Sequence, residues 1–201
     1  MHQTVNETLP RVTDIIAFSG LMPDYERWDP ERKGIGKGTA VDVGCQLLFQ
    51  GHKLEDLEVD PIILPYLVSL DLWLQHTGFK AEGVQQEGIS IGLGFIGHWD
   101  VHGTMGNRRT FARWMIDAKA AVKAKWHKLQ TAAYVHLARC QKIEIDHRGS
   151  LYLDEHGGMA KLDAHTDSSD WQCFFSALKL YQGEKEMEQY RENIRRWKEA
   201  A

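Results

Sequence analysis

The sequence predicts an α/β or α+β fold in which helices flank one central mixed sheet and a helical segment precedes it. Apolar residues recur with helical spacing up to residue 78. From residue 79, short segments rich in aromatic and β-branched residues alternate with Gly or Asn turns. The resulting order of helices, three strands, a helix, further strands and a last helix is typical of a sheet with helices on its faces.

The length of 201 residues fits a single domain with a substantial core. We assign residues 1–78 to a helical lead-in that packs on the rest. Residues 79–165 form the sheet core, and residues 166–201 form the C-terminal helices.

Three helices are expected in the lead-in. "VTDIIAFSGL" predicts the first, with Thr13 as its candidate N-cap. "TAVDVGCQLLFQG" predicts a second that stops at Gly51, and "DPIILPYLVSLDLWLQHTG" a third between Pro61 and Gly78. We interpret the intervening "RKGIGKG" as a Gly-rich loop, which lacks the Gly-Lys-Ser/Thr of a nucleotide-binding loop.

Three successive strands follow and predict an antiparallel meander: "KAEGVQQEGISIG", "FIGHWDVHGTM" and "RTFARWMIDAKA". "WHKLQTAAYVHLARC" then predicts a helix. "KIEIDH" and "SLYLDEHGGMAKLD" predict further strands, the last two joined at Gly157-Gly158.

A final helix is expected after a cap at Asp167, Ser168 or Ser169. Its apolar stripe consists of Met187, Tyr190, Ile194 and Trp197, and would dock on the body of the protein or on a second subunit.

The composition restricts the location and the partners. The net charge of −4 does not indicate nucleic-acid binding by the chain as a whole, although a local basic patch would suffice. Three widely spaced cysteines (Cys45, Cys140 and Cys173) argue against a structural zinc and for a reducing compartment. Without a signal-peptide pattern or a long apolar run, we expect a cytoplasmic protein that does not enter a membrane.

Two aspartates on neighbouring predicted strands are the main candidates for chemistry. Asp100 and Asp117 each follow hydrophobic residues, and two buried carboxylates repel each other unless a cation lies between them. A hard ion such as Mg²⁺ takes carboxylate, carbonyl and water ligands. Lys119 shares the strand face of Asp117, opposite Trp114 and Ile116. It could therefore contact an attacking water or the charge developing on a phosphate.

The next helix adds Gln130 and Tyr134, four residues apart and therefore on one helical face. The ordered set "GHWD", "DAK" and "QTAAY" resembles the PD-(D/E)xK nucleases, and more narrowly the RecB-type exonuclease branch, which includes stand-alone phage exonucleases. The helical lead-in and the closing helix resemble that branch as well. The resemblance implies a restriction-endonuclease-like core.

By position, the resemblance implies a role for each residue. Asp100, Asp117 and the backbone carbonyl of Ala118 would bind Mg²⁺ or Mn²⁺, and Lys119 would position or activate the nucleophilic water. Gln130 and Tyr134 would order the active site and touch the DNA strand; a satisfied polar pair that packs the helix on the sheet is the alternative.

The chain departs from that pattern at two places. The helix with "GTAVDVG" usually carries a His or an acidic residue, and here Asp42 is the expected ligand. The strand before Asp100 often supplies a Glu, but "VQQEG" has Gln85 and Gln86, which leaves Glu87 as the candidate ligand.

Basic residues around the third strand predict sequence-independent contacts with a DNA backbone. They are Lys123, Lys125 and Lys128, with Arg113 nearby. Trp126 could stack on a base or pack in the core, and His98 could contact DNA. A zinc site made by His98, Asp100 and His102 is a further alternative, because strand alternation would place all three on one face.

The sequence thus predicts a metal-dependent DNA exonuclease, in phage-type recombination, replication or DNA processing. The alternatives are a structure-specific or restriction-like endonuclease on the same core, and a non-catalytic DNA- or partner-binding protein of this fold. A homo-oligomer and a single-strand annealing or binding protein are the other partners considered.

Overall fold

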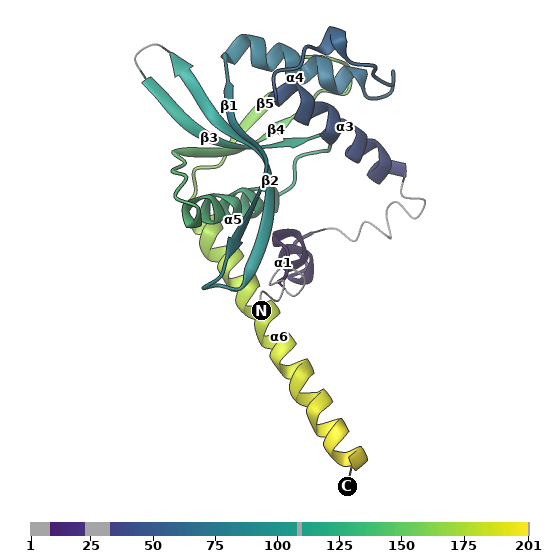
Figure 1. Ribbon diagram of the computed structural model, residues 1–201, viewed down its shortest axis with the longest axis vertical. Helices are drawn as coiled ribbons and strands as arrows, with labels where there is room; N and C mark the ends of the chain where they lie inside the picture. Colours follow the sequence, from purple (N-terminus) through teal and green to yellow (C-terminus); the bar gives the residue numbers. More distant parts are fainter. Residues whose placement is uncertain (1–8, 23–32, 108–109, 201) are drawn as a thin grey trace, which may run out of the picture.

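The computed structural model describes residues 9–22, 33–107 and 110–200 (Figure 1). A five-stranded mixed sheet is flanked by helices and preceded by a helical N-terminal part, so the predicted fold class is confirmed. No helix within these ranges is both long and apolar enough to cross a membrane.

The N-terminal part consists of α1 (Val12–Phe18), α3 (Lys33–Phe49), the short 3-10 helix η2 (Leu54–Asp56) and α4 (Leu64–Thr77). The predicted stop of α4 is confirmed, because Gly78 adopts the left-handed backbone conformation (φ 62°) and donates its N–H to the carbonyl of Leu74.

Two expectations for this part are wrong. From Lys33 on, the stretch interpreted as a Gly-rich loop lies in α3, where Lys37 Nζ donates to Tyr66 Oη of α4 at 2.8 Å and ties that turn to the neighbouring helix. The N-cap of α1 is Arg11 instead of Thr13, since the backbone N–H of Arg11 donates to the side chain of Asp14.

The sheet has the strand order β1–β2–β3–β4–β5, made of β1 (Lys80–Ser90), β2 (Phe95–Asn107), β3 (Thr110–Lys119), β4 (His147–Tyr152) and β5 (Lys161–Ala164). The predicted antiparallel meander of β1, β2 and β3 is confirmed. β3 and β4 are parallel, and α5 (His127–Cys140) connects them, as a parallel pair requires. β4 and β5 form the predicted antiparallel pair around Gly157-Gly158.

The stretch "KIEIDH" does not form the predicted strand. Lys142 has a left-handed backbone (φ 64°) directly after α5, and the N–H of Ile143 donates to the carbonyl of Ala138 within that helix. Ile145 is buried in the core beside α5. The alternating isoleucines therefore serve core packing in a loop, and β4 begins only at His147.

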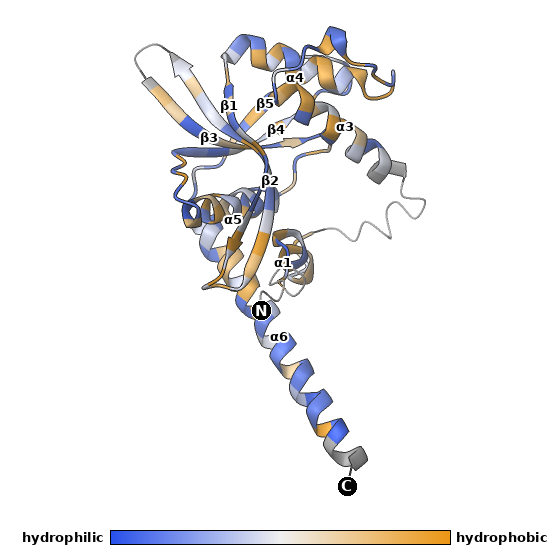
Figure 2. Cartoon of the chain, in the orientation of Figure 1, coloured by the Kyte–Doolittle hydropathy of each residue, from blue (hydrophilic) through white to orange (hydrophobic). Residues whose placement is uncertain are grey.

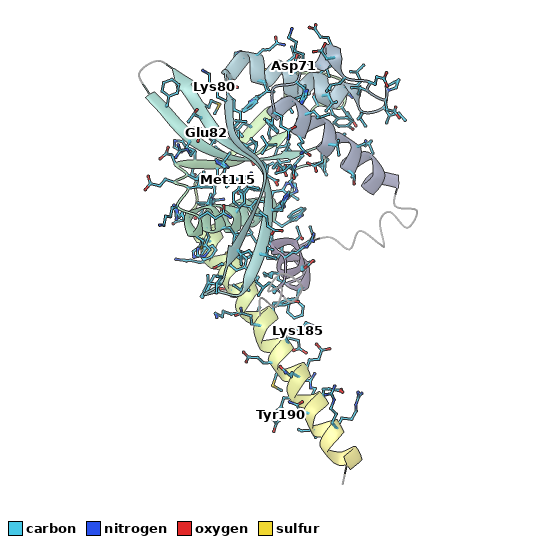
Figure 3. The ribbon with its side chains drawn as sticks, viewed as in Figure 1. Asp71, Lys80, Glu82, Met115, Lys185 and Tyr190 are labelled. Carbon is cyan, nitrogen blue, oxygen red and sulfur yellow. The ribbon has the colours of Figure 1, made fainter. Side chains whose placement is uncertain are left out.

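A hydrophobic core lies on each face of the sheet. One joins α1, α5 and α6 to the face that carries Trp99 and Met115. The other joins α3 and α4 to the face that carries Val101 and Ile116. Figure 3 labels Met115 near the centre of the sheet, above α5.

The last helix, α6 (Ser169–Ala200), starts at the predicted cap, where the side chain of Asp167 accepts a hydrogen bond from the N–H of Ser169. Asp170 in its first turn is 1% exposed and pairs with Lys128 of α5 and Arg148 of β4. These pairs fix the start of α6, whereas its second half extends away from the other elements (Figure 1).

We predict that Gly103→Ala destabilises the fold. Gly103 faces an irregularity in the β1–β2 pairing, and a Cβ atom there would lie 2.1 Å from the carbonyl oxygen of Lys80. Because backbone atoms must shift to relieve this overlap, we expect a loss of about 2 kcal/mol or more in the free energy of unfolding, measured with urea. The control Gly92→Ala meets no atom within 4 Å and should change it by less than ~0.5 kcal/mol; equal effects would contradict the prediction.

Candidate active site

The candidate site lies where β2 and β3 separate. Their pairing ends at Val101 and Ile116, so Asp100 and Asp117 are the first residues beyond the paired region. There, Oδ2 of Asp100 accepts a hydrogen bond from the backbone N–H of Ala118 at 2.8 Å. This bond replaces a strand-to-strand hydrogen bond and holds the Asp100 carboxylate against β3.

β2 changes the direction in which its side chains point at Asp100. Trp99 lies in the core beside α5, but Val101, two residues later, lies in the core beneath α3 and α4. Residues two apart normally share a face of a strand, so the strand is locally twisted here. In the neighbouring strand β1, Gln85 lies in the register opposite Asp100 and has a left-handed backbone (φ 50°).

A buried hydrogen bond supports this twist. Trp99 Nε1 donates to Nδ1 of His102 at 3.1 Å, and burial lowers the pKa of His102, which keeps the imidazole neutral and able to accept. Gly83 of β1 leaves the space for that ring, since a Cβ atom at Gly83 would lie 2.2 Å from it.

Asp117 and Lys119 share one face of β3, as predicted. Lys119 Nζ lies 2.5 Å from Oδ2 of Asp117, and the Asp117 side chain is 3% exposed. Burial alone would lower the pKa of Lys119, but Asp117 and Asp100 more than offset this and raise it. Lys119 is therefore a charged ammonium group, and its Nζ also lies 5.5 Å from the centre of the Trp126 ring.

The pKa of Asp100 is raised well above its ordinary value, first by burial and then by the negative charge of Asp117. Asp42 of α3 has its pKa raised as well, by desolvation and, among other causes, by Asp117. The fold thus brings three carboxylates within electrostatic range of one ammonium group. A second positive charge would relieve the repulsion that remains.

Asp42 is held by Gln85. The side-chain amide of Gln85 donates to Oδ1 of Asp42 at 3.2 Å, across the gap between β1 and α3. Sequence reasoning noted Gln85 only as a missing glutamate, but this contact makes it the residue that orients Asp42. Its left-handed backbone is the signal of that role, and a sequence does not reveal it.

The backbone at Ala118 fits a metal ligand. The carbonyl of Lys119 accepts a hydrogen bond from Leu153 beyond β4, so the N–H and carbonyl of the preceding Ala118 point to the opposite edge, toward β2. That N–H already contacts Asp100. Because β2 no longer pairs with β3 there, the Ala118 carbonyl and the Asp100 carboxylate face the same space.

These residues fit a hard divalent cation. Within residues 9–22, 33–107 and 110–200, no three His, Cys, Asp or Glu side chains are grouped as ligands for a metal. Mg²⁺ does not need such a group, because it usually keeps several waters and binds through one or two carboxylates. Asp100 and Asp117 supply two carboxylates, and Ala118 supplies a carbonyl oxygen. A cation bound there would reduce the repulsion from Asp117 that contributes to the raised pKa of Asp100.

Gln130 and Tyr134 form a buried pair on α5. Gln130 Nε2 donates to Oη of Tyr134 at 2.8 Å. Burial, and then Asp117, raise the pKa of Tyr134 well above its ordinary value, so the phenol is neutral. Gln130 Oε1 is buried and has no hydrogen-bond partner among the described residues. The pair therefore packs α5 beside the site and keeps an unused acceptor there.

Two cavities open near the site, and Asp42 lines the smaller of them. One of about 240 Å³ is lined by Asp42, Lys119, Lys37 and Cys45, and the other, of about 440 Å³, by Arg11, Thr13, His98 and Tyr134 among others. Sequence reasoning missed Lys37, Arg11 and Cys45 as residues near the site. The thiol of Cys45 is not a nucleophile, because burial, then Asp100 and Asp42, raise its pKa.

Glu87 and His98 lie at the edge of the site. They pair with each other across β1 and β2, both are exposed, and both line the larger cavity. Gln85, instead of Glu87, contacts Asp42. The alternative zinc site of His98, Asp100 and His102 does not form, because the twist at Asp100 turns His102 into the core with Trp99 while His98 points to the other face.

The predicted basic residues differ in their surroundings. Lys123 pairs with Asp163 at 2.6 Å and Lys128 with Asp170 at 2.8 Å, whereas exposed Lys125 forms no ion pair within the described part of the chain. Trp126 is 6% exposed and belongs to the hydrophobic core, so it packs in the core and is not available to stack on a base.

Arg113 precedes Asp117 on β3 and lies nearer the hairpin that joins β2 and β3. Its Nε pairs with Glu82 at 2.7 Å, and its N–H and carbonyl both bond Asp146. Arg113 therefore joins β1, β3 and the loop before β4, at a distance from the candidate site.

No protein-family profile matches the chain, and no curated protein matches its sequence.

We predict that Asp100→Asn stabilises the fold at neutral pH. The pKa of Asp100 in the folded protein lies above its value of ~3.9 in the unfolded chain. The contribution of this carboxyl to the free energy of unfolding is therefore fully present below pH ~3.9 and is lost as the pH rises through the folded pKa. An amide avoids that loss and can still accept from Ala118. The free energy of unfolding, measured with urea from acid to neutral pH, should therefore fall less for Asp100→Asn than for the parent. The same pH dependence in both, or an equal change in the exposed control Asp56→Asn, would contradict this.

Proposed function

We propose that this chain is a divalent-metal-dependent deoxyribonuclease, and specifically an exonuclease, that hydrolyses phosphodiester bonds. The observation that carries the proposal is the arrangement of Asp100, Asp117 and Lys119 where β2 and β3 separate. A buried carboxylate (Asp117), a half-buried one (Asp100), a backbone carbonyl and a charged lysine at one strand end suit the cleavage of a phosphodiester.

Each residue then has a task that follows from its position. Asp100, Asp117 and the Ala118 carbonyl would hold Mg²⁺ or Mn²⁺, which polarises a phosphoryl oxygen and lowers the pKa of a bound water. Lys119 remains an ammonium, so it donates hydrogen bonds to the water or to the phosphate instead of accepting a proton. Gln85 orients Asp42 beside them.

The DNA strand would run past the two cavities. Lys37 and Asp42 line one, and Arg11 lines the other. Lys125, which forms no ion pair with any of the residues that the structure describes, adds a positive charge on the loop after β3. Such charges bind a phosphate backbone without reading its sequence.

We expect Asp117→Asn and Lys119→Ala to reduce DNA cleavage by ~100-fold or more, since each removes a group that acts on the reacting phosphate. A time course with end-labelled single- and double-stranded DNA in Mg²⁺ or Mn²⁺, with EDTA as the metal-free arm, measures this. The matched control is Lys53→Ala, whose side chain is 73% exposed beside Glu55 of η2 and away from the site.

Full activity in Asp117→Asn or Lys119→Ala would contradict the assignment. Cutting of covalently closed circular DNA would favour the endonuclease alternative, because such DNA has no end. Binding of labelled DNA without turnover in any divalent metal would favour the non-catalytic alternative.

Cation binding has a readout of its own. Mg²⁺ or Mn²⁺ should raise the melting temperature of the parent chain, because a ligand that binds only the folded state stabilises it by about 2.7 kcal/mol at 100 times its Kd. Asp117→Asn should lose most of this shift, and Asp56→Asn should keep it. An equal shift in all three proteins would place the cation elsewhere.

A further inference from the structure

The distal half of α6, residues 183–200, carries an apolar stripe that faces solvent. Leu180 (65% exposed), just before the distal half, begins the stripe, and Met187 (49%) and Ile194 (38%) follow it at intervals of seven residues. Tyr190 (62%) lies between Met187 and Ile194. Figure 3 shows Tyr190 on the part of the helix that projects away from the sheet and its helices. The side chain of Trp197, the last residue of the predicted stripe, lies outside the described residues.

The stripe lies on the opposite side of α6 from the face that packs on the protein. Phe174 and Leu178 are fully buried against α1 and α5. At 100° per residue, Ile194 is turned by about 200° from Phe174. The side of the distal half that continues the packing face carries Lys185, Glu188 and Glu192 instead. The body of the same chain therefore does not cover the stripe, so the predicted docking of the stripe on the body of the protein is wrong.

The spacing of the stripe suits another helix. Apolar residues at intervals of three, four and seven form the seam of a coiled coil. In Figure 2 the distal half is mostly hydrophilic around its isolated hydrophobic positions, which does not suit a membrane surface. Glutamates at 184, 186 and 188 would repel DNA.

The charges point to a second copy of the same helix. Residues 184–188 are mainly acidic, and residues 191–196 are mainly basic. Two antiparallel copies would place the acidic part of each against the basic part of the other. Glu184 and Arg191 lie seven residues apart on the same edge of the stripe, and both are at least half exposed. Their ion pair of 3.6 Å within one helix is therefore worth little and can be exchanged between copies.

We propose that the distal half of α6 pairs with the same segment of a second copy in antiparallel orientation. Met187 of one helix then lies beside Tyr190 of the other, and Glu184 beside Arg191. The two folded bodies lie at opposite ends of the helix pair, so they do not collide. The seam is roughly 27 Å long, which predicts a reversible dimer instead of an obligate one. This proposal is independent of the nuclease assignment.

Sedimentation velocity of the full chain over a concentration series tests the dimer. Met187→Glu with Ile194→Glu should give a monomer, since both place a charge in the seam. The control Gln189→Glu adds the same charge outside the stripe and should leave the dimer intact. Far-UV circular dichroism checks that the variants keep a folded body.

Charge reversal tests the orientation. Glu184→Arg alone should raise the dissociation constant about tenfold, because two attractive contacts become repulsive. Adding Arg191→Glu should restore it in an antiparallel pair. In a parallel pair Glu184 would face Lys179 and Arg191 would face Glu186 of the second copy, so the double reversal would weaken the dimer further.

Three results would overturn the proposal. The first is a monomeric parent chain up to about 0.5 mM. The second is a dimer that survives Met187→Glu with Ile194→Glu, because the contact would then lie elsewhere. The third is a double reversal that does not restore association, which excludes the antiparallel arrangement.

Discussion

Asp100 and Asp117 repel each other inside the sheet, and the elements around them are arranged so that this repulsion is reduced. Lys119 contacts one carboxylate, and the N–H of Ala118 contacts the other. Both partners come from the strand that carries Asp117, and they are the two residues that follow it, Ala118 and Lys119. The site therefore depends on the last residues of β3, and β2 must lie close enough for Asp100 to reach the N–H of Ala118.

The local twist of β2 is what makes that distance possible. It turns Trp99 and His102 to the α5 face and Val101 to the α3 and α4 face, so each core holds one side of the strand. The twist is accompanied by a left-handed backbone at Gln85, and it requires a glycine at position 83, where a side chain would overlap the His102 ring. In return, Gln85 gains its contact with Asp42, which links α3 to the carboxylates.

Sequence patterns predict most of the helices and strands and their order in the fold. The meander, the crossing helix, the stop of α4 at Gly78 and the shared face of Asp117 and Lys119 all follow from periodicity and turn chemistry. The errors have a common cause, since contacts between distant residues override local pattern. Lys37 bonds Tyr66 and keeps a glycine-rich stretch helical, and the twist at Asp100 separates His98 from His102, which strict alternation would keep together.

The residues from Asp100 to Tyr134 belong to one continuous segment made of β2, β3 and α5. Short loops join these elements, so closing the contacts between them costs little chain entropy. Asp42 and Gln85 stand outside this segment, and α3 reaches the sheet across 43 residues of sequence between them. The core of the site can thus assemble early from neighbouring strands, while its third carboxylate arrives only when the N-terminal helices dock. The order in which the chain folds would then set the order in which the site gains its carboxylates.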